Sequence, residues 1–92
     1  MNKKNELILF CRNIKMLREE YNISKEEMAK ILGISQKTLS LIENDIIIPQ
    51  LSLKVVFRTA RYFGIEPAYL FHEDKIKTFL ESDVFRDKFV NK

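Results

Sequence analysis

The chain has 92 residues, of which 46% are hydrophobic and 32% are charged, with only two glycines and two prolines. This length and composition predict a single compact all-α domain and exclude a disordered chain or a second large domain. The 16 Lys and Arg residues exceed the 13 Asp and Glu residues and give a net charge of +3, which permits a polyanionic partner without requiring one.

The single cysteine, Cys11, cannot form an internal disulfide and fits a reducing compartment. It ends an apolar run from Leu7 that is too short for a secretory segment or a membrane span. We therefore expect a cytoplasmic protein with no membrane contact.

The first predicted helix has Asn5 as its candidate N-cap and presents apolar residues at three- and four-residue spacing. This stripe comprises Leu7, Phe10, Ile14, Leu17 and Tyr21. Ser24 and Glu27 then form a capping box that starts a helix over residues 25–32. The buried residues of that second helix are expected to be Met28, Ala29 and Leu32.

Gly33 follows the last apolar residue of the second helix, where a left-handed residue closes the helix end. Ser35 is a good N-cap for a third helix over residues 36–43, which turns Leu39 and Ile42 inward. Because each of these helices is too short to be stable alone, they must hold one another at a steep angle and leave a polar face outward.

A fourth helix is predicted over residues 53–63, with Ser52 as its cap and Gly64 at its end. Its predicted stripe comprises Leu53, Val56, Phe57, Ala60 and Phe63. Pro67 opens a short fifth helix that carries Leu70 and Phe71.

Beyond residue 71 the pattern predicts a helical C-terminal extension over residues 72–92, following a main domain over residues 6–71. Asp74 is a candidate cap for a helix bearing Ile76, Phe79 and Leu80. Ser82 or Asp83 could start another helix, which would bear Val84, Phe85 and Phe89.

These residues resemble the lambda-repressor-like, Cro and cI type (XRE) family of helix-turn-helix proteins. The matching positions are Ile14, Leu17, Arg18, Ala29, Gly33, Ser35, Leu39, Ile42 and Glu43, and the stretch "ARYFGIEPAYLF" extends the likeness to residue 71. The resemblance implies a compact five-helix DNA-binding domain of bacterial or phage origin. It also implies that an ion pair between Arg18 and Glu43 ties the first helix to the end of the third.

Three features depart from the family pattern. Lys25 stands where the family usually has glutamine, which replaces an amide by a charge suited to phosphate. Asp45 stands where glycine is common, so the turn after the third helix needs either a different conformation or an aspartate that tolerates a left-handed φ. The stretch "IIIPQ" makes the following connection about two residues longer than is usual in the family.

The major groove admits a helix and shows a distinct donor and acceptor pattern at each base pair. We expect base contacts from the exposed side of the third helix, at Gln36, Lys37 and Ser40. Phosphate contacts are expected from the groups around that helix, at Lys25, Thr38, Asn44 and Lys15. The alternative is that Gln36, Lys37 and Ser40 are only the solvated face of a short helix and contact no base.

The predicted function is a sequence-specific transcriptional regulator, a repressor that binds a palindromic operator as a homodimer. Two sets of apolar residues are candidates for the dimer contact: Ile46, Ile47 and Ile48 in the loop, and Phe79, Phe85 and Phe89 in the extension. The alternative for the extension is that its apolar residues cover the core of their own domain. The alternative function is an antitoxin or another protein-interaction module that keeps the helix-turn-helix fold and binds a protein partner through the extension.

No pattern of an enzyme is found. His72 is the only histidine and follows the fifth helix beside two acids, where a surface role is expected. One histidine and one distant cysteine do not make a metal site, and the chain has no Gly-rich phosphate loop. We expect no cofactor, no metal and no small-molecule ligand.

Overall fold

The computed structural model describes residues 3–48, 53–72 and 74–81. All regular structure in these residues is helical, which confirms the predicted all-α class. The elements in chain order are α1 (Lys3–Glu20), α2 (Lys25–Leu32), α3 (Gln36–Glu43), α4 (Leu53–Phe63), the 3₁₀ helix η1 (Pro67–Phe71) and α5 (Lys75–Leu80).

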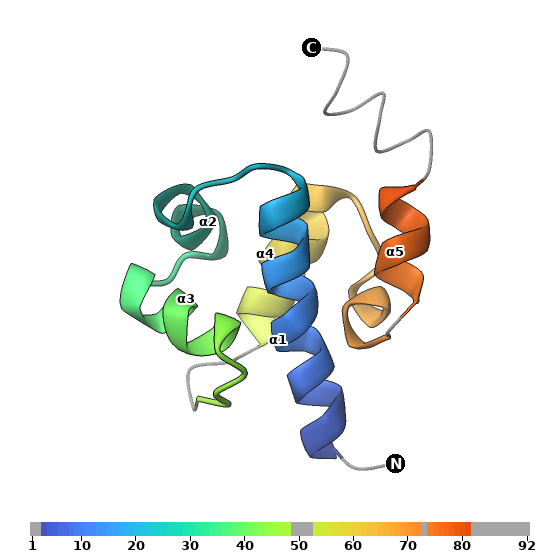
Figure 1. Ribbon diagram of the computed structural model, residues 1–92, viewed down its shortest axis with the longest axis horizontal. Helices are drawn as coiled ribbons and strands as arrows, with labels where there is room; N and C mark the ends of the chain where they lie inside the picture. The colour runs from blue at the N-terminus through green and yellow to red at the C-terminus, as the bar shows by residue number, and fades with distance from the viewer. Residues whose placement is uncertain (1–2, 49–52, 73, 82–92) are drawn as a thin grey trace.

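Helix α1 runs through the middle of the domain, with α2 and α3 on one side and α5 on the other (Figure 1). It packs against α3, η1 and α5, while α4 packs against α2 and η1. The short helices α2 and α3 therefore meet each other, and each also lies against a longer helix. This arrangement supplies the support that eight-residue helices lack in isolation.

One hydrophobic core joins all of these elements. Its buried residues are Phe10, Cys11, Ile14, Leu17, Met28, Ala29, Leu32, Leu39, Ile42, Val55, Val56, Ala60, Phe63, Leu70 and Ile76. Ile76 lies in the predicted C-terminal extension and is fully buried, so α5 shares the core of the preceding helices.

Asn13 of α1 is a buried polar residue that the sequence pattern did not single out. Its side-chain amide donates hydrogen bonds to the carbonyl oxygens of Leu70 at 2.7 Å and His72 at 3.0 Å. These two carbonyls lie at the end of η1, where backbone groups would otherwise have no partner. Asn13 thus fastens the C-terminal end of η1 to the middle of α1.

Two expectations for the first helix are wrong. The helix begins at Lys3, so Asn5 lies inside it and does not cap it. Leu7 is only partly buried and does not belong to the core, whereas Cys11 on the next turn is fully buried. The predicted residues Phe10, Ile14 and Leu17 are fully buried, so the stripe is confirmed over the rest of α1.

The predicted buried face of the fourth helix is also partly wrong. Leu53 is 71% exposed and Phe57 is 52% exposed, while Val55 and Thr59 are buried with the other predicted residues. Thr59 tolerates burial because its hydroxyl donates to the Val55 carbonyl at 2.8 Å. The apolar residues of α4 cover more than one face, and its contacts with α2 and η1 select which face is buried.

The remaining helix expectations have mixed outcomes. Residues 67–71 form a 3₁₀ helix, with the Tyr69 amide bonded to the Glu66 carbonyl at 3.0 Å. Asp74 precedes α5 but makes no side-chain capping hydrogen bond, because its backbone is already helical. The predicted cap Ser52 and the predicted final helix with Val84, Phe85 and Phe89 lie outside the described residues.

Burial raises the pKa of the Cys11 thiol to about 11, from an ordinary value of 9.0. The unfolded chain therefore loses this proton at lower pH than the folded chain, and alkaline pH favours unfolding. We expect the thiol's contribution to the free energy of unfolding to be complete below about pH 8.5 and to fall by about 2 to 3 kcal/mol as the pH rises through 11.

The measurement is urea unfolding of the native chain and Cys11→Ala at a series of pH values. The variant should start less stable, because a side chain is truncated in the core, but should lose less stability over the alkaline range. Parallel pH profiles for the two proteins would contradict the expected titration of Cys11.

Candidate nucleic-acid interface

The segment α2–turn–α3 has a serine cap at the start of each helix. The Ser24 hydroxyl accepts a hydrogen bond from the Glu27 amide at 3.1 Å, and the Ser35 hydroxyl accepts one from the Thr38 amide at 3.0 Å. Both predicted caps are confirmed, the first as one half of the predicted capping box. The caps fix the residues at which the two helices begin.

Gly33 closes α2 with a left-handed backbone, at φ 73° and ψ 35°. Its amide bonds to the Lys30 carbonyl at 3.2 Å, and the Ile34 amide bonds to the Ala29 carbonyl at 3.0 Å. These bonds end the helix and turn the chain toward α3. A Cβ atom at Gly33 would lie only 3.1 Å from Nε of Arg58, which itself donates to the Ile31 carbonyl at 3.0 Å.

Gly33→Ala is expected to lower the free energy of unfolding by about 1 to 2 kcal/mol through its left-handed backbone alone, with a further loss from crowding of Arg58. Chemical denaturation measures this loss. In the Arg58→Ala background the same glycine substitution should cost less, because only the backbone strain remains. An equal cost in both backgrounds would show that Arg58 does not limit the space at this turn.

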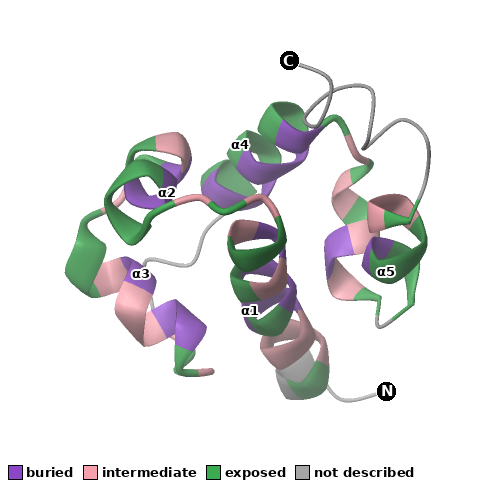
Figure 2. Ribbon diagram, turned by 45° about the horizontal axis from the view of Figure 1, so that its top comes forward, coloured by how far each residue is buried: buried purple, intermediate pink, exposed green. Residues whose placement is uncertain are grey.

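The first five residues of α3 include the side chains predicted to contact bases. Gln36 and Lys37 are exposed and Ser40 is partly buried, while Leu39 is fully buried on the opposite side. The exposed colour covers the turn between α2 and α3 and the start of α3 in Figure 2. No acidic residue lies in the first turn of α3, so amide, ammonium and hydroxyl groups are presented without a competing carboxylate.

Two of the predicted phosphate-binding residues are themselves held by hydrogen bonds. The Ser35 hydroxyl donates to the Thr38 hydroxyl at 2.9 Å, which leaves the Thr38 proton available to another acceptor. Asn44 follows the end of α3 and donates its side-chain amide to the Ser40 carbonyl at 2.8 Å. Asn44 is exposed and keeps one further N–H and its side-chain oxygen for other contacts.

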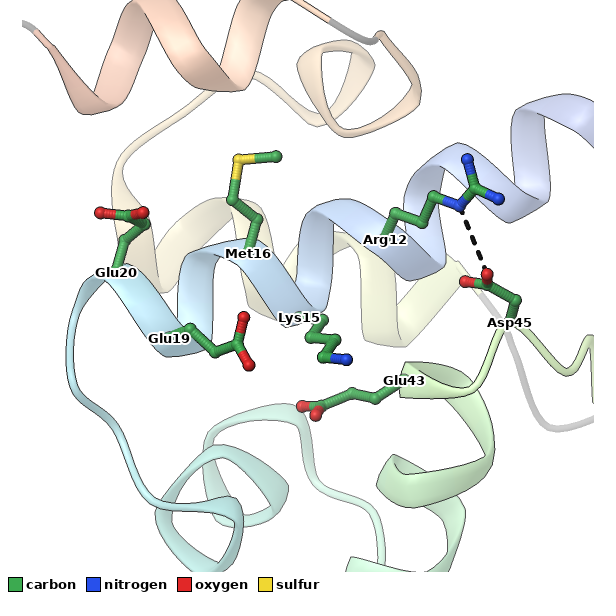
Figure 3. A pocket seen from close by; sticks show the side chains of 7 residues that line it. All are labelled: Arg12, Lys15, Met16, Glu19, Glu20, Glu43 and Asp45. Atoms are coloured by element: carbon green, nitrogen blue, oxygen red, sulfur yellow. Dashed lines mark hydrogen bonds and ion pairs between the residues drawn. The ribbon is translucent and has the colours of Figure 1, made fainter.

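The two predicted phosphate-binding lysines lie in different surroundings. Lys25 is exposed at the first position of α2, where backbone amides and the helix dipole favour an anion. Lys15 shares a hollow of about 430 Å³ with acidic side chains (Figure 3). The residues that line this hollow are Arg12, Lys15, Met16, Glu19, Glu20, Glu43 and Asp45. The carboxylates around Lys15 disfavour a phosphate there.

The expected ion pair between Arg18 and Glu43 is present and has two hydrogen bonds. Arg18 donates to the two carboxylate oxygens at 2.6 Å and 3.0 Å, and it also donates to the Ile23 carbonyl at 3.1 Å. The side chains of Arg18 and Glu43 are 14% and 3% exposed, respectively. The hydrogen bond to Glu43 raises the pKa of Arg18, which keeps the guanidinium charged. Arg18 thus joins α1, the turn before α2 and the end of α3.

A second ion pair holds the turn after α3 and was not predicted. Asp45 adopts the left-handed backbone expected where the family has glycine, with φ 62°. Its carboxylate accepts a hydrogen bond from Nε of Arg12 at 3.3 Å (Figure 3). Arg12 and Asp45 are far apart in the sequence, and nothing in the spacing of charges on α1 indicates which acid would lie beside Arg12.

The residues predicted for a dimer contact are partly exposed. Ile46 is 46% exposed and Ile47 is 38% exposed, whereas Ile48 is partly buried and packs against the core. Phe79 is partly buried on α5. Phe85 and Phe89 lie outside the described residues, so the structure describes only part of the second candidate surface.

Neither a metal site nor a membrane span is found in the described ranges. No group of three or more His, Cys, Asp or Glu residues in them is arranged to hold a metal ion. None of the helices that the structure describes is long and apolar enough to cross a bilayer. His72 is exposed after η1.

Two short capped helices, joined at a left-handed glycine and pinned to a longer first helix, define a helix-turn-helix domain. Residues 14–70 match the family model described as Helix-turn-helix, and the chain belongs to this XRE-type family of transcriptional regulators, as the motif predicted. No solved structure is significantly similar to it.

Two archaeal relatives are similar over most of their own length. An uncharacterized HTH-type transcriptional regulator of Methanocaldococcus jannaschii is 36% identical over 64 residues, which cover 67% of this chain and 94% of the relative. One from Archaeoglobus fulgidus is 34% identical over 65 residues, covering 68% of this chain and 89% of the relative. These relatives do not support the bacterial or phage origin that the resemblance implied.

Proposed function

We propose that this protein is a sequence-specific DNA-binding repressor that occupies a palindromic operator as a homodimer in the cytoplasm. The observation that carries the proposal is the N-terminal half of α3, where exposed Gln36 and Lys37 and partly buried Ser40 project from a helix fixed at both ends. The fixed ends matter because a base-reading side chain must be placed to within a fraction of an ångström. The proposal assigns no enzymatic activity and no cofactor.

In the proposed complex, α3 lies in the major groove and its N-terminal side chains meet the base edges. The Gln36 amide can donate and accept together, which matches the N6 and N7 groups of adenine. The Lys37 ammonium suits the acceptors of guanine, and the Ser40 hydroxyl can serve either as a donor or as an acceptor. Gln36 is therefore assigned the main role in base discrimination.

Phosphate contacts would set the orientation of α3 without reading sequence. Lys25 at the start of α2 is the strongest candidate, because its charge adds to the positive end of the helix dipole. Thr38 and Asn44 lie at opposite ends of α3, so their contacts would hold both ends of that helix against the backbone. Lys15 is the weakest candidate, because of the acids around it.

A homodimer would place two copies of α3 in major grooves one helical turn apart, about 34 Å. The exposed Ile46 and Ile47 follow α3 directly, so a contact there would couple subunit pairing to the position of α3. The interaction-module alternative depends on the extension over residues 72–92, of which the structure describes residues 72 and 74–81. The interaction module remains a prediction from the sequence, and no contact among the described residues supports it.

The experiment is selection of bound sequences from a random duplex pool, followed by titration of the winning duplex at several salt concentrations. We expect an inverted-repeat motif, and if a dimer neutralises about six phosphates, a slope near −5 in the plot of log affinity against log salt. A motif without repeat symmetry would contradict the homodimer. No enrichment over the starting pool would contradict the proposed function.

A further inference from the structure

The outward side of α4 is rich in large apolar side chains. Leu53, Phe57 and Tyr62 are 71%, 52% and 43% exposed, although the helix buries a complete face against the core. In Figure 2 the exposed colour follows the side of α4 opposite its buried residues. Isolated exposed apolar residues are ordinary, but here Leu53 and Phe57 lie one turn apart on one edge of this side and Tyr62 lies on the opposite edge, with the cationic residues of α4 between them. We call this surface the α4 outer face; it comprises Leu53, Lys54, Phe57, Arg58, Arg61 and Tyr62.

Two hollows border the α4 outer face and share Arg61 as a lining residue, one toward η1 and the other toward α2. The first has a volume of about 280 Å³ and is lined by Phe57, Ala60, Arg61, Ile65 and Pro67. The second has a volume of about 440 Å³ and is lined by Ile31, Arg58, Arg61 and Tyr62. The Arg61 side chain therefore separates a depression whose other walls are largely apolar from one whose other walls combine Ile31 and Tyr62 with the Arg58 guanidinium.

The charge of this face has one sign. Lys54, Arg58 and Arg61 are exposed, and α4 contains no acidic residue. Arg58 is already engaged, because it donates to the Ile31 carbonyl at the end of α2. Neither Lys54 nor Arg61 forms an ion pair with any residue that the structure describes. The face thus offers two cations whose charges are not balanced by a neighbouring carboxylate.

The positive charge argues against a second copy of this chain as the occupant. A two-fold contact through the α4 outer face would place Lys54 and Arg61 of one subunit near the same cations of the other, and like charges brought together oppose association. A nucleic-acid backbone would match the charge but would not supply aliphatic groups for the two hollows. An acidic protein segment with apolar side chains satisfies both features.

From these observations we infer that the α4 outer face is a docking surface for an acidic, amphipathic segment of another protein. One apolar side chain would enter each hollow, and a carboxylate between them would pair with Arg61. Arginine suits this role because its planar guanidinium binds a carboxylate through two parallel hydrogen bonds. The inference goes beyond the proposed DNA binding and does not depend on it.

The test uses the full chain and a displayed library of random peptides of about 12 residues, a length that covers the 11-residue helix. Selected peptides should be net negative and should carry at least two large apolar side chains. Arg61→Glu and Phe57→Ser should each weaken the best peptide by about tenfold or more in fluorescence anisotropy. Lys77→Glu makes the same charge change at an exposed position of α5 and should have little effect on peptide affinity.

Each alternative occupant gives a distinct result that would overturn the inference. A change of sedimentation behaviour in Arg61→Glu would indicate self-association through this face. A larger loss of DNA affinity in Arg61→Glu than in Lys77→Glu would make the face part of the DNA interface. Tighter peptide binding after Phe85→Ser and Phe89→Ser would show that the C-terminal residues occupy it. The inference would also be overturned if no peptide were enriched, or if the selected peptides bound Arg61→Glu as tightly as the native chain.

Discussion

Glu43→Ala is expected to lower the free energy of unfolding by about 3 to 5 kcal/mol, more than any other substitution proposed for this chain. The Glu43 side chain is only 3% exposed and accepts two hydrogen bonds from Arg18. Removal of this side chain leaves the largely buried Arg18 guanidinium without its carboxylate partner, and little water can reach the guanidinium to take the place of the carboxylate. Urea unfolding followed by circular dichroism measures the change.

Glu19 provides a matched control on the same arginine. It lies 4.0 Å from Arg18 but its side chain is 57% exposed, so Glu19→Ala should cost less than about 1 kcal/mol. The double variant Arg18→Ala, Glu43→Ala should be less destabilised than the sum of its single changes, since neither partner is left alone. If Glu43→Ala were as mild as Glu19→Ala, the pair would not be holding α3 against α1.

Gln36→Ala is expected to reduce discrimination at one base pair in each half-site by about 1 to 3 kcal/mol, or roughly 5- to 150-fold. The side chain is exposed on the first turn of α3, so its loss should leave the free energy of unfolding unchanged within about 0.5 kcal/mol. The measurement compares affinities for the selected duplex and for duplexes substituted at each position.

Lys25→Ala gives the contrasting result expected of a phosphate-binding residue. It should weaken binding to all duplexes alike and make the salt slope shallower by about one unit for each phosphate that is no longer neutralised. Lys30→Ala removes the same charge near the other end of α2, where Lys30 lies 4.0 Å from Glu26. This control should change neither the DNA affinity nor the salt slope much. Equal relaxation of sequence preference by Gln36→Ala and Lys25→Ala would refute the division of roles.

Sequence reasoning was most accurate where local chemistry decides the structure. The bounds of α2 and α3 agree with the predicted ranges, because serine caps and a left-handed glycine specify helix ends within a few residues. The short helix opened by Pro67 is also found, as the 3₁₀ helix η1. The predictions were least accurate at the start of α1 and at the cap expected from Asp74. Asn5 has a side chain suited to an N-cap, but α1 already begins at Lys3, so Asn5 lies inside the helix.

The residues proposed to contact bases and the residues that support the helices differ in how far the sequence could indicate them. Gln36, Lys37 and Ser40 could be named from their positions on a predicted helix, and Arg18 with Glu43 from the family motif. Arg58 over Gly33, Asn13 beneath η1 and Arg12 beside Asp45 could not be named. Each pairs residues that are at least 25 positions apart and of types that are common on helix surfaces.

Periodicity, caps and turn residues were enough to specify the helical class and the two central helices, because these signals act over three or four neighbouring residues. The family was indicated by the resemblance of residues spread over the sequence to a known motif. Which side of α4 would be buried depended on packing, since apolar residues lie on more than one of its sides and each satisfies a helical spacing. Contacts with α2 and η1 select one side, and Leu53 and Phe57 remain in solvent because burial is settled by neighbouring surfaces in three dimensions.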